Sequence, residues 1–565
     1  DIDLSGHDLT GANLSGANLS GARLPRKLEG VNLSGVDLRD RDLSGHDLTG
    51  ANLSGANVSG ARLPRKLARA NLSGHDFSNQ DLSDHDLSGA NVSGARLPRK
   101  MQRVNLSGVD LRDRDLSDTK ITLANLSGAN LEGAKLSFTN LSGANLSGAN
   151  LSYTKLSFTN LSNTNLSSTI LSYTNLRGAN LLGTTLPREL EGVNLSGVDL
   201  SGRDLSNAVL TGANLSNTNL SNTNLRGAEL SRVDLSGANV SGAQLSGALQ
   251  GANLSGVDLS SKNLSKADLT GANLSGANLS GTTLPRELQR VNLSGVDLSR
   301  RGLSNTNLSF TNLSNTNLSG ANLSKSNLLN AILSNTNLSG ANLSGANLAT
   351  VLAGANLAGA NLLGAVIPLN LQGVNLAGVD LTRYDLTTSN LAGANLEGAN
   401  LPHGSAPRHM PGANLSGIDL SRRDLTGANL EGANLEGANL CHASLSNAIL
   451  TGANIEQADL NGANLSNANL SGASLMGASL VGVNLAGANL MNADLSDCLI
   501  RNSTIDGCLN IHSARLDGAQ GMPTGFKFLC PSCRTQGKHL RVSLDIRNDA
   551  YGQGYLRAVC DRHNR

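Results

Sequence analysis

Leucine returns every five residues through most of this chain, from Leu4 to Leu495. Around each such leucine, written here as position i, position i−2 is usually Ala, i−1 is Asn or Asp, i+1 is Ser and i+2 is Gly. Five residues advance about 500° around an α-helix, so a helix would scatter these leucines over all its faces. An extended path that turns a corner once per repeat points i−2 and i inward, with glycine at the corner. The period therefore predicts a solenoid with a narrow core of Leu and Ala.

The motif Ala12-Asn13-Leu14-Ser15-Gly16 and its copies resemble the pentapeptide repeat family over about residues 3–505. The resemblance implies an all-β fold, a right-handed quadrilateral β-helix with four repeats per coil, in which i fills the core and i−2 packs beside it. With coils about 4.8 Å apart, about 25 coils would form a rod roughly 120 Å long. We therefore expect a β-helix rod over residues 1–510.

Composition narrows the possible functions. Aromatic residues make up 2% of the 565 residues and Trp is absent, which suits a thin core. No run of about twenty apolar residues occurs, so we expect no membrane span. The formal net charge is +1. As a separate expectation, a location in the cytoplasm or within a large particle is favoured over secretion. The repeat is in register from Asp3 with no capping element, which leads to the hypothesis of end-to-end association at an uncapped N-terminal coil.

The five-residue rhythm is shortened at nine places, here called slips, where the next i position follows after four residues. Counting each shortened step as one face, most intervals between slips are multiples of four faces, which favours four faces per coil. Proline in most slips predicts a local break in the hydrogen-bond ladder. Five slips carry Pro-Arg-Lys or Pro-Arg-Glu, which we expect to form protein-contact loops. Their candidate contact residues are Pro25, Arg26, Lys27, Pro64, Arg65, Lys66, Pro98, Arg99, Lys100, Pro187, Arg188, Pro285 and Arg286.

Seventeen residues after the residue that opens a slip, a large residue replaces the small i−2 alanine at eight of the nine slips. We hypothesise that these side chains point inward, fill the space left by the shortened face and bond carbonyls freed by the broken ladder. The alternative is duplication of a sequence cassette without a role for the large residue. The residues concerned are Arg41, Gln80, Arg114, Arg203, Lys262, Arg301, Tyr384 and Arg423.

Two other residue types stand out in the repeat. Histidine takes i−2 positions four times, at His7, His46, His75 and His85, in separate coils without a ligand-like cluster, which favours histidines at the edge of the core over a metal site. Aromatic residues pair at i+2 one coil apart on the outside. These pairs, Phe138 with Phe158 and Tyr153 with Tyr173, are either a contact patch or simply stacked on each other.

The repeat decays after Ile505, and a different composition follows. Cys530, Cys533, Cys560 and His563 form two short hooks that suit tetrahedral zinc, with strand-like stretches between them. Because protein would fill all four ligand positions, the zinc would be structural; a disulfide with a spare cysteine is the alternative. We expect a linker over residues 511–525 and a zinc-ribbon-like domain over residues 526–565.

Nothing else in the sequence resembles a catalytic constellation, so we expect no enzyme. The length, near-neutral charge and basic slips favour a structural scaffold, cement or spacer that bridges other protein subunits of a large assembly. The family resemblance offers an alternative, a DNA-mimic inhibitor of a topoisomerase, which would need a strongly acidic surface. A second alternative is nucleic-acid binding through the basic C-terminal segment, which is not favoured. An ice-binding threonine array is discounted because these threonines take the inward i−2 position.

Overall fold

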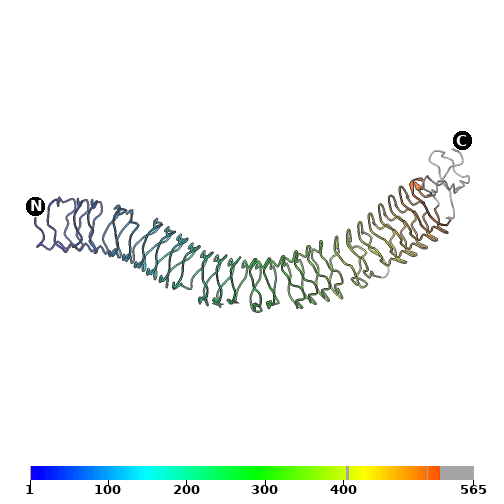
Figure 1. Ribbon diagram of the computed structural model, residues 1–565, viewed down its shortest axis with the longest axis horizontal. Helices are drawn as coiled ribbons and strands as arrows, with labels where there is room; N and C mark the ends of the chain where they lie inside the picture. The colour runs from blue at the N-terminus through cyan, green and yellow to red at the C-terminus, as the bar shows by residue number, and fades with distance from the viewer. Residues whose placement is uncertain (1, 403–405, 506, 522–565) are drawn as a thin grey trace, which may run out of the picture. The chain divides into compact units, whose positions relative to one another are not determined.

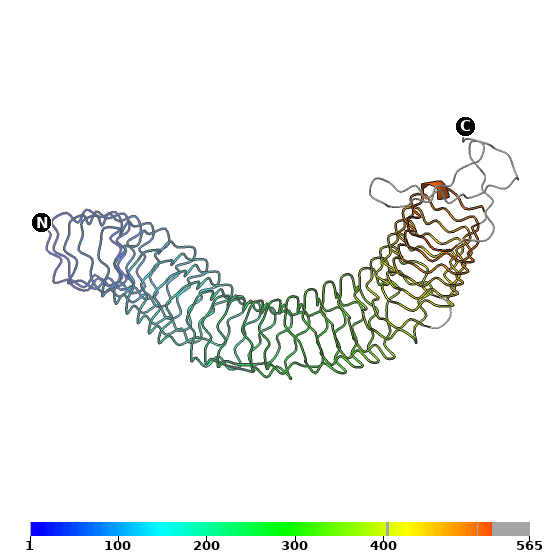
Figure 2. The ribbon, with the colours of Figure 1, turned by 45° about the vertical axis from the view of Figure 1, so that its right-hand side comes forward.

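The computed structural model describes residues 2–402, 406–505 and 507–521. The chain forms two units, Asp1–Pro285 and Arg286–Arg565, and within each unit successive coils stack on one another (Figure 1). Figure 2 shows the same coils after a turn of 45°, as loops that bend at corners. In each unit the described coils follow the same repeat.

Parallel pairing between coils fixes the number of repeats per coil. In the first unit Asn125 pairs with Asn145 and Asn145 with Asn165, so partners lie four five-residue repeats apart. Where a slip intervenes the spacing is one residue shorter, as between Asn52 and Asn71. The predicted four-repeat coil of parallel strands is therefore confirmed. The predicted total of about 25 coils stays a prediction.

Regular elements are short because each face turns a corner after a few residues. Two strands, β1 (Asn224–Arg226) and β2 (Gln244–Ser246), pair in parallel with Leu225 opposite Leu245. Elsewhere in the described residues the coils pair through single-residue bridges. One 3₁₀-helix, η1, spans Ile511–Ser513. The described part of the chain holds no helix of the length and apolar character needed to cross a membrane.

The corners are β-turns specified by the repeat. The N–H of Ala17 donates to the carbonyl of Leu14 at 3.0 Å, and Gly16 has φ 63°, as a type II turn requires at its third residue. The carboxamide of Asn13 accepts the N–H of Ser15 at 3.1 Å, which satisfies a second amide of the corner. Asn and Gly therefore recur because the side chain of one and the backbone freedom of the other are needed at the corner.

The core is the predicted column of i and i−2 side chains. Leucines such as Leu146 and alanines such as Ala149 are fully buried. Threonine at i−2 also points inward: the hydroxyl of Thr154 donates to the carbonyl of Leu131 at 2.9 Å. An inward hydroxyl with a carbonyl partner cannot contribute to a flat external array, in agreement with the expectation from sequence.

Asparagine at i−1 adds side-chain ladders along the faces. The Nδ2 of Asn145 donates to Oδ1 of Asn125, and Asn165 donates to Asn145, both at 3.3 Å. Each Oδ1 also accepts a turn N–H, so one amide links its own corner to the coils on either side.

The coil extends beyond the boundary predicted at residue 510. Asp494 pairs with Arg515 and Leu499 with Gln520, so residues of the expected linker complete a further coil. The repeat decays there in sequence, but backbone pairing needs only an extended path and not the leucine motif. The expected zinc-ribbon-like domain at residues 526–565 lies outside the described residues.

We predict that acid destabilises the fold through the corner aspartates. The hydroxyl and N–H of Ser44 hold the pKa of Asp42 below its ordinary value, and Ser78 and Ser117 do the same for Asp76 and Asp115. These pKa values are lower in the folded state than in the unfolded state. The ionised aspartates therefore stabilise the fold fully above the unfolded pKa of about 3.9, and this stabilisation is lost as the pH falls through the folded pKa values. The midpoint temperature of thermal unfolding should therefore decrease when the pH is lowered below about 4.

The matched control replaces Asp42, Asp76 and Asp115 together with Asn, which still accepts the serine N–H but does not titrate. The triple variant should lose part of the acid-induced drop in the unfolding midpoint, measured by circular dichroism between pH 2 and pH 7. An unchanged pH profile in the triple variant would contradict this assignment.

Candidate protein-contact surfaces and slip sites

The basic slip loops point their charged residues outward. Arg26, Lys27, Arg65, Lys66, Arg99, Lys100, Arg188 and Arg286 are exposed. The prolines at 25, 64, 98 and 285 are buried and Pro187 is half-buried, so the accessible part of each loop is its charged pair, which is Arg-Lys in three loops and Arg-Glu in two. Lys66 is the most constrained of these side chains, because its ammonium lies 2.8 Å from the carboxylate of Asp47.

The hydrogen-bond ladder breaks at the slip opened by Leu97. Asn91 and Arg96 pair with the coil before them but have no bridge to the coil that follows, among the described residues. In an unbroken coil the carbonyl of an i−2 residue accepts an N–H from the following coil, as the carbonyl of Ala124 does from Asn145. At this slip no described backbone N–H reaches the i−2 carbonyls of Ala90 and Ala95.

The guanidinium of Arg114 takes the place of one missing N–H. Its Nη1 donates to the carbonyl of Ala95 at 2.7 Å, and its Nη2 donates to the carbonyl of Val92. Arg114 is half-buried and points inward from the coil that follows the slip. A planar fork with several donors suits two carbonyls on neighbouring faces.

The same arrangement recurs at other slips with different side chains. The ammonium of Lys262 donates to the carbonyl of Ala243 at 2.7 Å, and its burial lowers its pKa. Desolvation also lowers the pKa of Arg301, which is half-buried. The remaining donor and acceptor pairs are Arg41 with Ala22, Arg203 with Thr184 and Leu181, Tyr384 with Ala365 and Leu362, and Arg423 with Leu401 and Pro402.

The slip opened by Leu348 lacks a large residue at the seventeenth position, and its ladder is intact. Asn347 pairs with Val366, and the N–H of Val366 donates to the carbonyl of Ala346 at 2.8 Å. A side-chain donor is thus absent where the backbone still reaches and present at the slips with a broken ladder, except at the slip opened by Leu63. A duplicated cassette without a role for the large residue would not show this correlation.

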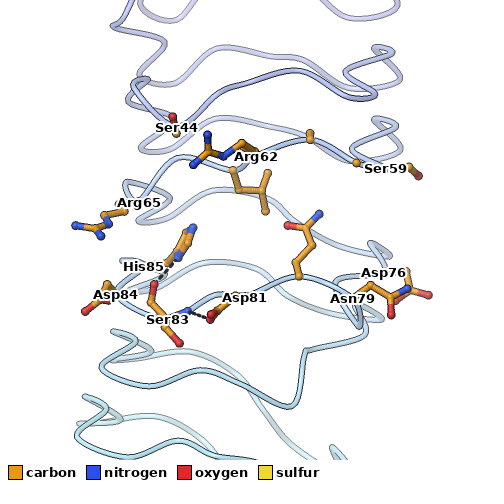
Figure 3. A pocket seen from close by; sticks show the side chains of 14 residues that line it. Ser44, Ser59, Arg62, Arg65, Asp76, Asn79, Asp81, Ser83, Asp84 and His85 are labelled. Atoms are coloured by element: carbon orange, nitrogen blue, oxygen red, sulfur yellow. Dashed lines mark hydrogen bonds between the residues drawn. The ribbon is translucent and has the colours of Figure 1, made fainter.

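Gln80 occupies the corresponding place at the slip opened by Leu63. It lines a cleft of about 910 Å³ together with residues of the two coils that the slip separates (Figure 3). Unlike the donors at the other slips, its carboxamide makes no hydrogen bond within the described residues.

An apolar ridge, which we did not predict from sequence, covers one edge of the second unit. The slips opened by Leu348 and Ile367 are stacked directly, and in place of the basic pair they expose Val351 and Leu369, at 58% and 62%. The ridge consists of Phe310, Leu329, Ile332, Val351, Val366 and Leu369, each exposed by at least a third. The available signal was the replacement of Pro-Arg-Lys by Ala-Thr-Val and Pro-Leu-Asn.

The aromatic pairs are stacked and exposed at the same time. Phe138 and Phe158 have ring centroids 5.5 Å apart, as do Tyr153 and Tyr173, and all four rings are more than half exposed. Each residue has φ near +60° at its corner, where glycine is the usual residue. Stacking explains how these corners are tolerated. The rings of Phe158 and Tyr173 also lie close to Gly178 and Gly192 of the following coil, where an added Cβ would clash with them.

Histidines and cysteines form no metal site in the described residues. His75 is buried and stacks on Phe77, in keeping with a core-edge role, whereas His7 is exposed. Cys498 is buried, and desolvation raises its pKa to about 12. The predicted zinc ligands Cys530, Cys533, Cys560 and His563 lie outside the described residues, so the zinc site stays a prediction.

A known protein family matches most of the chain. The family model described as pentapeptide repeats (8 copies) matches in successive segments from residue 1 to residue 497. The comparison with curated proteins finds no match.

Three solved structures illustrate what the chain is similar to. HetL, a pentapeptide repeat protein involved in heterocyst differentiation regulation from the cyanobacterium Nostoc, is 24% identical, with a TM-score of 0.12, over 59% of this chain and 89% of its own. Rfr23 from the cyanobacterium Cyanothece is 28% identical, with a TM-score of 0.12, over 26% and 90%. QnrB1, a plasmid-mediated fluoroquinolone resistance protein, is 23% identical, with a TM-score of 0.13, over 34% and 92%.

We predict that Arg114→Met removes local stability at the Leu97 slip. Methionine keeps much of the buried volume but cannot donate, which leaves the carbonyl of Ala95 unsatisfied at a cost of about 1–3 kcal/mol. Amide hydrogen exchange in the coils on either side should accelerate by roughly 5- to 150-fold, as mass spectrometry of residues 88–118 can measure. Arg112→Met, at an exposed arginine of the same coil, is the matched control and should leave exchange almost unchanged. Equal exchange in both variants would contradict the assigned role.

Proposed function

The chain belongs to the pentapeptide repeat family, whose members fold as right-handed quadrilateral β-helices, and on that premise we propose that it is a non-enzymatic structural scaffold. In this role the protein acts as a spacer or cement that bridges protein components of a large assembly, in the cytoplasm or within a large particle. Its partners are other proteins, held along the faces of the coils.

The apolar ridge is the observation that supports this proposal most. Ile332 pairs with Val351 on one face, while Val366 lies on the adjacent face, so the exposed side chains follow a single edge over several coils. Contiguous exposed apolar side chains on a soluble surface mark contact sites, because burying them against a partner is favourable by about 25 cal/mol per Å² of apolar surface removed from water. Because the apolar ridge projects from one edge of the stacked coils, its shape is complementary to an apolar groove on a partner protein.

The basic slip loops supply a second type of contact. Arg26 with Lys27, Arg65 with Lys66 and Arg99 with Lys100 are exposed pairs on a scaffold that repeats with every coil. Such pairs suit acidic protein surfaces and would fix orientation and partner choice more than affinity.

Inhibition of a topoisomerase by DNA mimicry, which the family resemblance offers, is the competing function. Mimicry requires a surface of dense negative charge, whereas this chain carries 44 basic and 43 acidic residues and exposes basic loops. Nucleic-acid binding through the proposed zinc ribbon is a second competing function, and the affinity for nucleic acid would then fall steeply as the salt concentration rises.

The test combines partner identification with a variant drawn from the chain's own slips. Cross-linking mass spectrometry on native source material should join Lys27, Lys66 and Lys100 to several copies of an abundant structural protein. Val351→Lys with Leu369→Arg places the basic pair of the other slips on the ridge, so the fold should persist. We expect this double variant to bind the partner at least tenfold more weakly, as a pull-down or calorimetry would measure.

Ala377→Glu is the matched control, because it adds charge at a half-exposed i+1 corner away from the ridge, where Glu397 shows that glutamate is accepted. The control should bind normally. A topoisomerase or nucleic acid as the sole cross-linked partner would overturn the scaffold proposal, and full binding by the double variant would exclude the ridge as its contact surface.

A further inference from the structure

We infer that the cleft at the Leu63 slip is a guanidinium-binding site that accepts an arginine side chain from a partner protein. The inference goes beyond the proposed function and does not depend on it. It rests on a comparison of this slip with the other slips of the same chain, where the chain supplies such a side chain itself.

The Leu63 slip has the broken ladder of its counterparts. Asn57 and Arg62 pair with the preceding coil but form no bridge to Asp76 or Asp81 in the following one, among the described residues. Asp81 also has no described bridge to Lys100 on its other side. At this face Asp81 thus forms no bridge to either neighbouring coil, although the adjacent corner stays bonded to the following coil through Asp84 and Gln102. The cleft of about 910 Å³ lies between the coil of Asp81 and the preceding coil. This volume lies in the range of about 300–1,000 Å³ typical of ligand sites.

The carbonyl of Ala61 lacks the donor that its counterparts have. Ala61 is buried and lines the cleft, and its carbonyl accepts no hydrogen bond from the described residues. The equivalent carbonyls of Ala22, Ala95, Thr184, Ala243 and Ala365 each accept a bond from the side chain at the seventeenth position. Here that position is Gln80, whose side chain is shorter than that of arginine. A buried carbonyl without a partner costs free energy. A ligand that donates to this carbonyl therefore forms the hydrogen bond that the folded chain itself does not make.

The other slips also indicate which donor the cleft accepts. The guanidinium of Arg114 bonds the carbonyls of Ala95 and Val92, and the equivalent pair at this slip is Ala61 and Val58. Arginine presents two donors in a plane, which an ammonium group cannot reproduce in that geometry. Arginine is the donor at four slips with a described bond, while Lys262 and Tyr384 serve at one slip each. The cleft is therefore complementary first to a guanidinium, the group that most of its counterparts use.

The lining adds a carboxylate that forms no ion pair within the described residues. Figure 3 shows Arg62 on one coil and Asp81, Ser83 and His85 on the facing coil. Asp84 is held by Arg103 at 2.6 and 2.8 Å, whereas Asp81 is bonded by Ser83, whose N–H donates to it at 2.9 Å. Asp81 is therefore available to neutralise an entering guanidinium, which carries its charge at every accessible pH.

The test measures binding of Nα-acetyl-L-arginine amide to the full-length protein, by saturation-transfer NMR and by hydrogen exchange over residues 56–86. The arginine probe should bind and slow exchange in these residues, whereas Nα-acetyl-L-lysine amide should bind about tenfold more weakly or not at all. Gln80→Arg should abolish binding, because the chain then supplies its own guanidinium as at the other slips. Absence of binding to the unmodified protein, or equal binding to Gln80→Arg, would overturn the inference.

A reciprocal variant provides the matched control. Arg41→Gln recreates at the Leu24 slip the residue found at the Leu63 slip, and it should gain a second site for the arginine probe. To separate the possible sources of the group, guanidinium chloride at the same millimolar concentration is compared with a short peptide that contains one arginine. Tighter binding of the peptide supports a partner's side chain, and equal binding of the free ion overturns that part of the inference.

Discussion

Hydrogen bonding between successive coils is the constraint on which the rest of this structure depends. A short extended face cannot satisfy its own N–H and C=O groups, so each coil needs the coils directly before and after it. The narrow core of Leu and Ala keeps the coils the same size, and the turn at each corner keeps the faces aligned. Stability is therefore local: it arises between neighbouring coils and is repeated along each unit.

The slips show what happens when this constraint is violated. At most slips a shortened face removes backbone pairing on two faces, and a side chain from the following coil replaces part of it. The ladder stays intact at the Leu348 slip, and no described side chain replaces it at the Leu63 slip. Arginine, lysine and tyrosine all serve, although they share little except length and a terminal donor. The common requirement is a hydrogen-bond donor that reaches the carbonyl from the following coil, and the guanidinium of Arg114 meets it at two carbonyls at once. Gln80 fails this requirement because of its length, and the cleft beside it is the result.

Much of the fold could be read from the sequence because one short motif repeats without long-range ambiguity. The five-residue period predicted the inward positions, and the spacing of slips predicted four repeats per coil. The apolar ridge escaped prediction because its residues lie far apart in sequence, from Phe310 to Leu369, and meet only when the slips at Leu348 and Ile367 stack. The spacing places Gln80 among the inward donors, but it does not reveal whether the side chain reaches its acceptor. Residues 526–565 carry no repeat, so the periodicity could not inform their structure.

The coupling between a slip and its donor limits how such a chain can change length. A deletion or insertion of four complete repeats between two slips adds or removes one whole coil and leaves every other pair of faces aligned. Any change of length within the segment that separates a slip from its donor would carry the donor to another face or another coil and leave the carbonyl without a donor. The length of the solenoid can thus change only by whole coils, and the segment from each slip to its donor behaves as one structural block.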